Sequence, residues 1–160
     1  MKEYRNNGAK GALLDEYERA IKDLKKVIKR VSESELVQIV DIDTPDEDCR
    51  SIQSILAHVV RSGYVYVMRV RMIQGEECIF PERISLKSVK EYNKALDKMF
   101  EFNVQLFNDY PDLDLENTDN DTKVDFLSGQ LYDFEQLFEH AIVHILRHRR
   151  QIERYLLKMK

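Results

Sequence analysis

Long stretches of uninterrupted helical period constrain the fold of this chain more than any other feature. The 160 residues include only 5 Gly and 3 Pro, the two residues that most often break helices. Over residues 11–33, apolar side chains recur every three or four residues, which is the spacing of one buried face on an α-helix. The same spacing predicts a second helix that begins between residues 46 and 50 and ends at Gly75, followed by helices over residues 88–110 and roughly 131–157.

Turn-forming sequences separate these segments. Residues 76–86 contain a proline and no helical period, and Pro111 ends the third helix. Residues 111–130 are acidic and rich in turn formers, which predicts a solvated crossover with room for a short hairpin; they lack the Gly and Glu of a calcium-binding EF-hand loop. Four helices without a long strand predict an all-α, four-helix bundle in a single domain over residues 1–160.

Charge disfavours nucleic acid as a partner. The formal net charge is −4 and the isoelectric point is about 5.6, whereas nucleic-acid-binding proteins usually carry a basic face. The four arginines at positions 147, 149, 150 and 154 lie near the end of the last predicted helix, where cations are favoured in any protein.

The cysteines and the hydropathy pattern favour a cytoplasmic protein. Cys49 and Cys78 are too few and too far apart for a disulfide framework. The first 20 residues lack the apolar core of a signal peptide, and no apolar run is long enough to cross a membrane.

Histidines are concentrated in two of the predicted helices. His140, His144 and His148 follow one another at four-residue steps, so neighbouring members lie on nearly the same helix face. His140 and His148 are about 12 Å apart along the axis, too far to share one ion when metal–nitrogen bonds are about 2.0–2.1 Å long. The helix can therefore offer His140 with His144, or His144 with His148, and another helix must supply a third ligand.

His58 is the remaining imidazole. It shares a helix face with Ile55 and Val65, which predicts that it points into the bundle. A lone histidine on such a face is more often a hydrogen-bonded core residue, and pairs at four-residue spacing also arise by chance. Since unpaired neutral imidazoles are costly to bury, four of them on inward-facing stripes favour a metal site.

Two segments carry a resemblance to a known family. "SILAHVV" in the second predicted helix and "HAIVHILRHRRQIERYL" in the last resemble the DinB/YfiT-like superfamily, whose last helix has the pattern H-x-x-x-H-R-x-Q-[IL]. The resemblance extends over the whole chain in helix order and length. It implies up-down-down-up connectivity and a metal held by His58, His144 and His148, with His140 as a neighbour one turn away.

The chain departs from the family pattern near these motifs. Arg150 stands where Gly is common, Arg50 and Ser51 replace a Trp–Ser/Thr pair, and Ser54 stands in place of a Glu. These departures concern substrate recognition more than metal binding.

Three neutral imidazoles would leave a Zn²⁺ or Ni²⁺ ion with an open coordination position, which suits catalysis by hydrolysis or by thiol transfer. The resemblance favours a transferase that uses a low-molecular-weight thiol and an electrophilic small molecule. A metal-dependent hydrolase and a non-catalytic metal-binding or small-molecule-binding stress-response protein are the alternatives, and a homodimer is expected by analogy. Glu139, His140, Ser62 and Gln151 are candidates for a general base, but their spacing assigns that role to none of them.

Overall fold

The computed structural model describes residues 4–126 and 129–160, and helices dominate it. The long helices are α1 (Gly8–Ile28), α3 (Ile52–Ile73), α4 (Val89–Asp109) and α5 (Phe134–Lys158). The short elements are α2 (Glu33–Val37), the 3-10 helices η1 (Glu47–Cys49) and η2 (Asn120–Thr122), and the strands β1 (Val124–Asp125) and β2 (Leu131–Tyr132). The predicted all-α class is confirmed.

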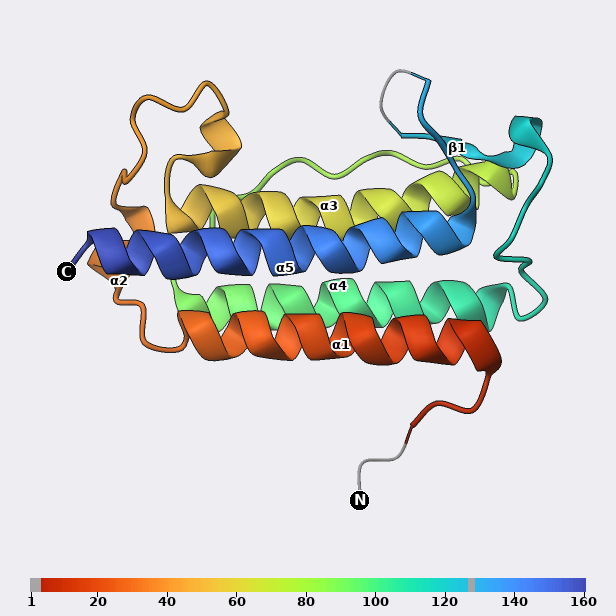
Figure 1. Ribbon diagram of the computed structural model, residues 1–160, viewed down its shortest axis with the longest axis horizontal. Coiled ribbons are helices and arrows are strands. Elements are labelled where there is room, and N and C mark those ends of the chain that lie inside the picture. The colour runs from red at the N-terminus through yellow and green to blue at the C-terminus, as the bar shows by residue number, and fades with distance from the viewer. Residues whose placement is uncertain (1–3, 127–128) are drawn as a thin grey trace.

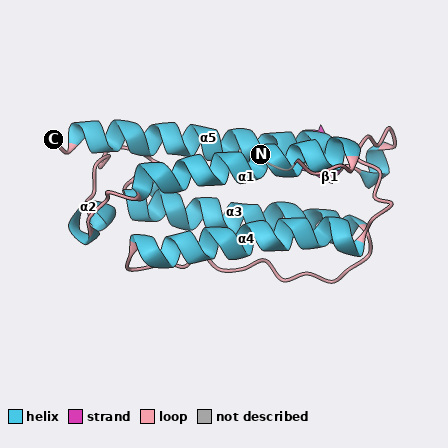
Figure 2. Cartoon of the chain, turned by 90° about the horizontal axis from the view of Figure 1, so that it is seen from below, coloured by secondary structure: helices cyan, strands magenta, loops and turns pink. Residues whose placement is uncertain are grey.

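The long helices pack as a bundle in which each packs mainly against two others. α1 packs against α5 and α4, and α3 packs against α4 and α5 (Figure 1). Figure 1 shows α1 and α5 running from right to left, and α3 and α4 from left to right. Because α3 and α4 run in the same direction, residues 74–88 cross back along the bundle to join them, as the extended loop in Figure 2 shows.

Hydrogen bonds fix this crossover to the helices beneath it. The Arg61 side chain donates to the carbonyl of Pro81 at 2.9 Å, and the Gln53 amide donates to the carbonyl of Leu86 at 2.8 Å. The Tyr92 hydroxyl accepts from the Leu86 N–H and donates to the Gln53 carbonyl. The crossover therefore has a defined path over α3 and α4.

Side-chain caps explain where the helices begin. α3 starts at Ile52, later than predicted, because Ser51 and Ser54 form a reciprocal capping box and the preceding residues form η1. α5 starts at Phe134 because Asp133 caps it, while Leu131 and Tyr132, predicted to be helical, pair with β1.

The prediction of a solvated segment over residues 111–130 was wrong in part. Leu113, Leu115 and Val124 are buried against the bundle, and the Leu115 carbonyl accepts the N–H of Phe134 at 3.1 Å. These apolar residues alternate with acidic ones, so the segment covers the end of the bundle while its carboxylates face water. Residues 127 and 128 of the predicted hairpin lie outside the described residues.

None of the helices in the described residues is both long enough and apolar enough to span a membrane.

Close packing between α3 and α4 depends on a glycine. A Cβ atom at Gly63 would lie 2.3 Å from Sδ and 2.6 Å from Cγ of Met99, which is fully buried. Asn103, also fully buried, donates to the Gly63 carbonyl at 3.4 Å and to the Met99 carbonyl at 2.8 Å. The small residue lets the two parallel helices approach at this point.

Gly63→Ala is therefore expected to lower the free energy of unfolding by about 1–3 kcal/mol through overpacking. An ordinary helical Gly→Ala change would raise it by up to about 1 kcal/mol. Urea unfolding of the single variants and of the Gly63→Ala/Met99→Ala double variant measures the coupling. If Gly63→Ala stabilises the protein as much with Met99 present as without it, the close contact is not there.

Candidate metal centre

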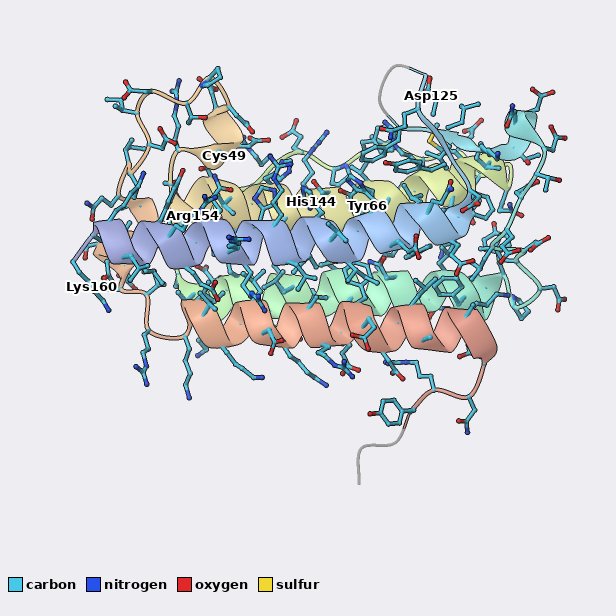
Figure 3. The ribbon with its side chains drawn as sticks, viewed as in Figure 1. Cys49, Tyr66, Asp125, His144, Arg154 and Lys160 are labelled. Atoms are coloured by element: carbon cyan, nitrogen blue, oxygen red, sulfur yellow. The ribbon has the colours of Figure 1, made fainter. Side chains whose placement is uncertain are left out.

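Three of the four histidines meet between α3 and α5. One ring nitrogen each of His58, His144 and His148 lies within 4.8 Å of the others. Nε2 of His144 is 2.9 Å from Nε2 of His58 and 3.1 Å from Nε2 of His148. Figure 3 shows His144 on the face of α5 that borders α3, between Cys49 on one side and Tyr66 on the other.

Helix geometry explains this convergence. His144 and His148 are one turn apart on α5, and His58 faces them from α3, which packs directly against α5. His148 is only 4% exposed and lies between the buried Ile145 and Ile152, as predicted. On α3, Ile55 is fully buried as predicted, whereas Val65 is half-buried.

Two of the rings have oxygen partners at Nδ1. Nδ1–H of His58 donates to Oδ2 of Asp48 at 2.8 Å, and Nδ1–H of His148 donates to Oε1 of Gln151 at 3.0 Å. Both acceptors are oxygen atoms, so in the neutral rings the Nε2 atoms carry lone pairs. Such partners at the remote nitrogen are the usual companions of metal-binding histidines.

The donor set fits a divalent metal ion. Ligands about 2.0–2.1 Å from one ion are roughly 2.9–3.4 Å apart for neighbouring octahedral or tetrahedral positions. The two separations that involve His144, 2.9 and 3.1 Å, lie within that range, and all three nitrogen atoms lie within 4.8 Å of one another. With His58 and His148 donating through Nδ1, only His144 can place a hydrogen among the three converging Nε2 atoms. A cation at their centre would use all three lone pairs.

Burial keeps the three imidazoles neutral. Burial, together with the charges of neighbouring histidines, lowers the pKa of His144 to about 2, and burial together with His58 lowers that of His148 to about 4. The pKa of His58 is also lowered, mainly by burial, although its side chain is 27% exposed. The three imidazoles are thus neutral at neutral pH, and the cluster is open to solvent beside His58.

His140 lies outside this set. Its ring centroid is 6.1 Å from that of His144 but only 4.5 Å from that of Phe126, and Tyr132 and Tyr66 lie within 6 Å. Phe126 and Tyr132 of the hairpin and Tyr66 of α3 therefore surround His140 with aromatic rings. Of the two histidine pairs that helix geometry allowed, the structure joins His144 and His148 to His58.

The other three candidates for a general base lie in different surroundings. Gln151 lies beside the site and accepts from His148, whereas Glu139 is exposed and lines a surface groove between α1 and α5. Ser62 is buried and hydrogen-bonds with Tyr66. Cys49 is a free thiol whose pKa is raised, first by burial, so it is not a ready nucleophile.

Asp48, Arg83 and the aromatic residues around His140 were missed by the sequence analysis. Asp48 lies in an acidic turn whose composition is typical of the start of a helix. Arg83 lies in the connection that has no helical period. The ten-residue spacing from Asp48 to His58 does not predict a contact within one helix or one strand, so only the fold brings these two residues together.

A comparison with protein families bears on this site. The sequence model of the DinB superfamily matches residues 16–152, which include all three clustered histidines. The chain belongs to the DinB superfamily. A search of curated proteins found no match. Membership and the three-histidine cluster together fit a metal-binding DinB-like protein.

Two of the departures from the DinB pattern have a structural role in this chain. Ser51 and Ser54 cap α3 through each other's backbone N–H groups, so they fix the helix that carries His58. Arg150 is exposed on α5, away from the buried face that holds His148.

The metal-free protein is expected to lose stability as pH falls from 6.5 to 5. The unfolded chain binds protons on histidines of pKa about 6.5, whereas folded His144 and His148 stay neutral down to about 2 and 4. Acid therefore favours the unfolded state, by up to about 1.4 kcal/mol per pH unit for each such histidine. Urea unfolding in the presence of a chelator at pH 7, 6 and 5 measures this slope. His144→Leu should reduce it; an unchanged slope would contradict the assignment of a neutral, buried His144.

Proposed function

We propose that this DinB superfamily member is a divalent-metal-dependent enzyme whose ion, zinc or nickel, is held by His58, His144 and His148. The observation that carries the proposal is the convergence of three neutral Nε2 atoms from two helices, two of them with oxygen partners at Nδ1. Three neutral ligands leave the charge of the ion uncompensated and at least one coordination position free, as in catalytic sites. The partial exposure of His58 gives a ligand access from solvent.

Such an ion would lower the pKa of a coordinated thiol or water toward or below neutrality. We propose thiol transfer as the reaction, because the resemblance to the DinB superfamily implies a low-molecular-weight thiol as co-substrate. In that reaction the thiol gives its proton to solvent, its sulfur forms a bond to an electrophilic carbon, and the leaving group departs with the bonding electron pair.

The protein's own groups act mainly by positioning in this mechanism. Asp48 and Gln151 accept hydrogen bonds from the Nδ1–H groups of His58 and His148. Burial raises the pKa of Tyr66, which lies against His144 with ring centroids 6.0 Å apart, so its phenol stays protonated at neutral pH. We assign no general base among these residues.

Metal analysis tests the ligand set. Protein purified without a histidine tag is expected to contain about one ion per chain by inductively coupled plasma mass spectrometry. His58→Ala, His144→Ala and His148→Ala should each lose it, while His140→Ala, with its ring outside the cluster, should keep it. A wild type that stays metal-free after dialysis against Zn²⁺ and Ni²⁺ would contradict the proposal, as would a site that depends on His140.

Turnover separates the candidate functions. Metal-loaded wild type is expected to accelerate conjugation of a small thiol to 1-chloro-2,4-dinitrobenzene or to monochlorobimane, and His144→Ala should fall to the uncatalysed rate. Hydrolysis of nitrophenyl esters without thiol would favour the hydrolase instead. A filled metal site with neither activity across a panel of thiols and electrophiles would favour a binding protein.

A further inference from the structure

Asp48 occupies a position that the ligand set alone does not explain. It is the middle residue of η1, and the Asp46 side chain accepts its N–H at 3.0 Å, which fixes the turn. One carboxylate oxygen, Oδ2, accepts Nδ1–H of His58 at 2.8 Å. The other, Oδ1, forms an ion pair with Arg83 of the crossover between α3 and α4. The carboxylate is thus held from two sides with one oxygen directed at His58.

The same turn also contacts the α5 side of the cluster. The carbonyl of Cys49 accepts a hydrogen bond from the Tyr155 hydroxyl. The Cys49 thiol lies 3.7 Å from Oε1 of Gln151. That oxygen is the acceptor for Nδ1–H of His148. Two neighbouring residues of η1 therefore contact both sides of the cluster. Asp48 bonds to His58 of α3, and Cys49 lies beside Gln151, the partner of His148 on α5.

We propose that Asp48, anchored by Arg83, is a positioning residue that fixes His58 in the tautomer presenting Nε2 to the centre of the cluster. A carboxylate acceptor at Nδ1 holds the ring in one orientation and makes Nε2 a stronger donor. Asp48 also places a negative charge next to a centre whose three ligands are neutral. Its effect on metal affinity depends on the proposed metal site, whereas its effect on the tautomer of His58 does not.

A purely structural role for Asp48 is the competing explanation. The ion pair with Arg83 links η1 to the crossover, so Asp48 could serve only to hold these two segments together. In that case its loss would change thermal stability and leave the His58 ring unaffected. Tautomer and affinity are therefore the discriminating measurements.

The first measurement is the tautomer of His58 in metal-free protein at pH 7.5, from long-range ¹H–¹⁵N correlation spectra assigned with His58→Gln. The wild type is expected to show a single form with Nδ1 protonated and Nε2 bare. Asp48→Ala should show both tautomers in exchange. Asp48→Asn, whose side-chain oxygen can still accept a hydrogen bond, should keep the wild-type tautomer, with a less basic Nε2 on His58. Glu47→Gln removes one carboxylate from the same turn, where Glu47 pairs with Arg50 and not with a histidine, and should match wild type.

The second measurement is the dissociation constant for Zn²⁺ and Ni²⁺ by competition with a chelator. Asp48→Ala is expected to weaken binding by about 10- to 100-fold and Asp48→Asn by less, with Glu47→Gln close to wild type. If His58 in Asp48→Ala keeps the single wild-type tautomer, the proposal is overturned, even where thermal stability falls. If the wild type binds no metal, the proposed function fails, and the spectra of the metal-free proteins still decide the role of Asp48.

Discussion

The packing of α3 against α5 is the contact on which the site depends. His58 and the pair His144 and His148 come from different helices, and their Nε2 atoms lie as close as 2.9 Å. Because each residue advances a helix by about 1.5 Å, a slip of one residue would separate these atoms. The capping box at Ser51 and the cap at Asp133 fix where each helix begins, and the packing of the two helices fixes their register. The parallel course of α3 and α4 adds a second constraint, since it requires the crossover that brings Arg83 to Asp48.

The cluster places stability and function in opposition. Desolvated imidazoles cost free energy unless each polar atom finds a partner, and the lowered pKa values of His144 and His148 reflect this burial. Asp48 and Gln151 satisfy two of the Nδ1 groups, but the three converging Nε2 atoms lack enough hydrogens to satisfy one another. A bound cation would interact with the Nε2 lone pairs that have no hydrogen-bond donor, so metal binding and folding stability are coupled in the proposed account.

Local pattern was sufficient to predict the helices and to offer the four histidines as candidate ligands. The apolar faces of α1, α3, α4 and α5 follow from three- and four-residue spacing, and the histidines stand on those faces. Spacing left two histidine pairs open, and the resemblance to the DinB superfamily indicated the pair that the structure joins to His58. Asp48, Arg83 and the aromatic surroundings of His140 could not be predicted, because their contacts join segments far apart in sequence. The burial of Leu113 and Leu115 was missed because the acidic residues on either side of them dominate the composition of that segment.

X-ray absorption spectroscopy at the zinc or nickel edge of metal-loaded, tag-free protein tests the central claim most directly. The account predicts a nitrogen and oxygen shell, at about 2.0–2.1 Å for zinc, with the multiple-scattering signature of three imidazoles. His144→Ala treated in the same way should retain too little metal to give this spectrum. A sulfur shell at about 2.3 Å from Cys49, or a spectrum with one imidazole or none, would contradict a centre built on His58, His144 and His148.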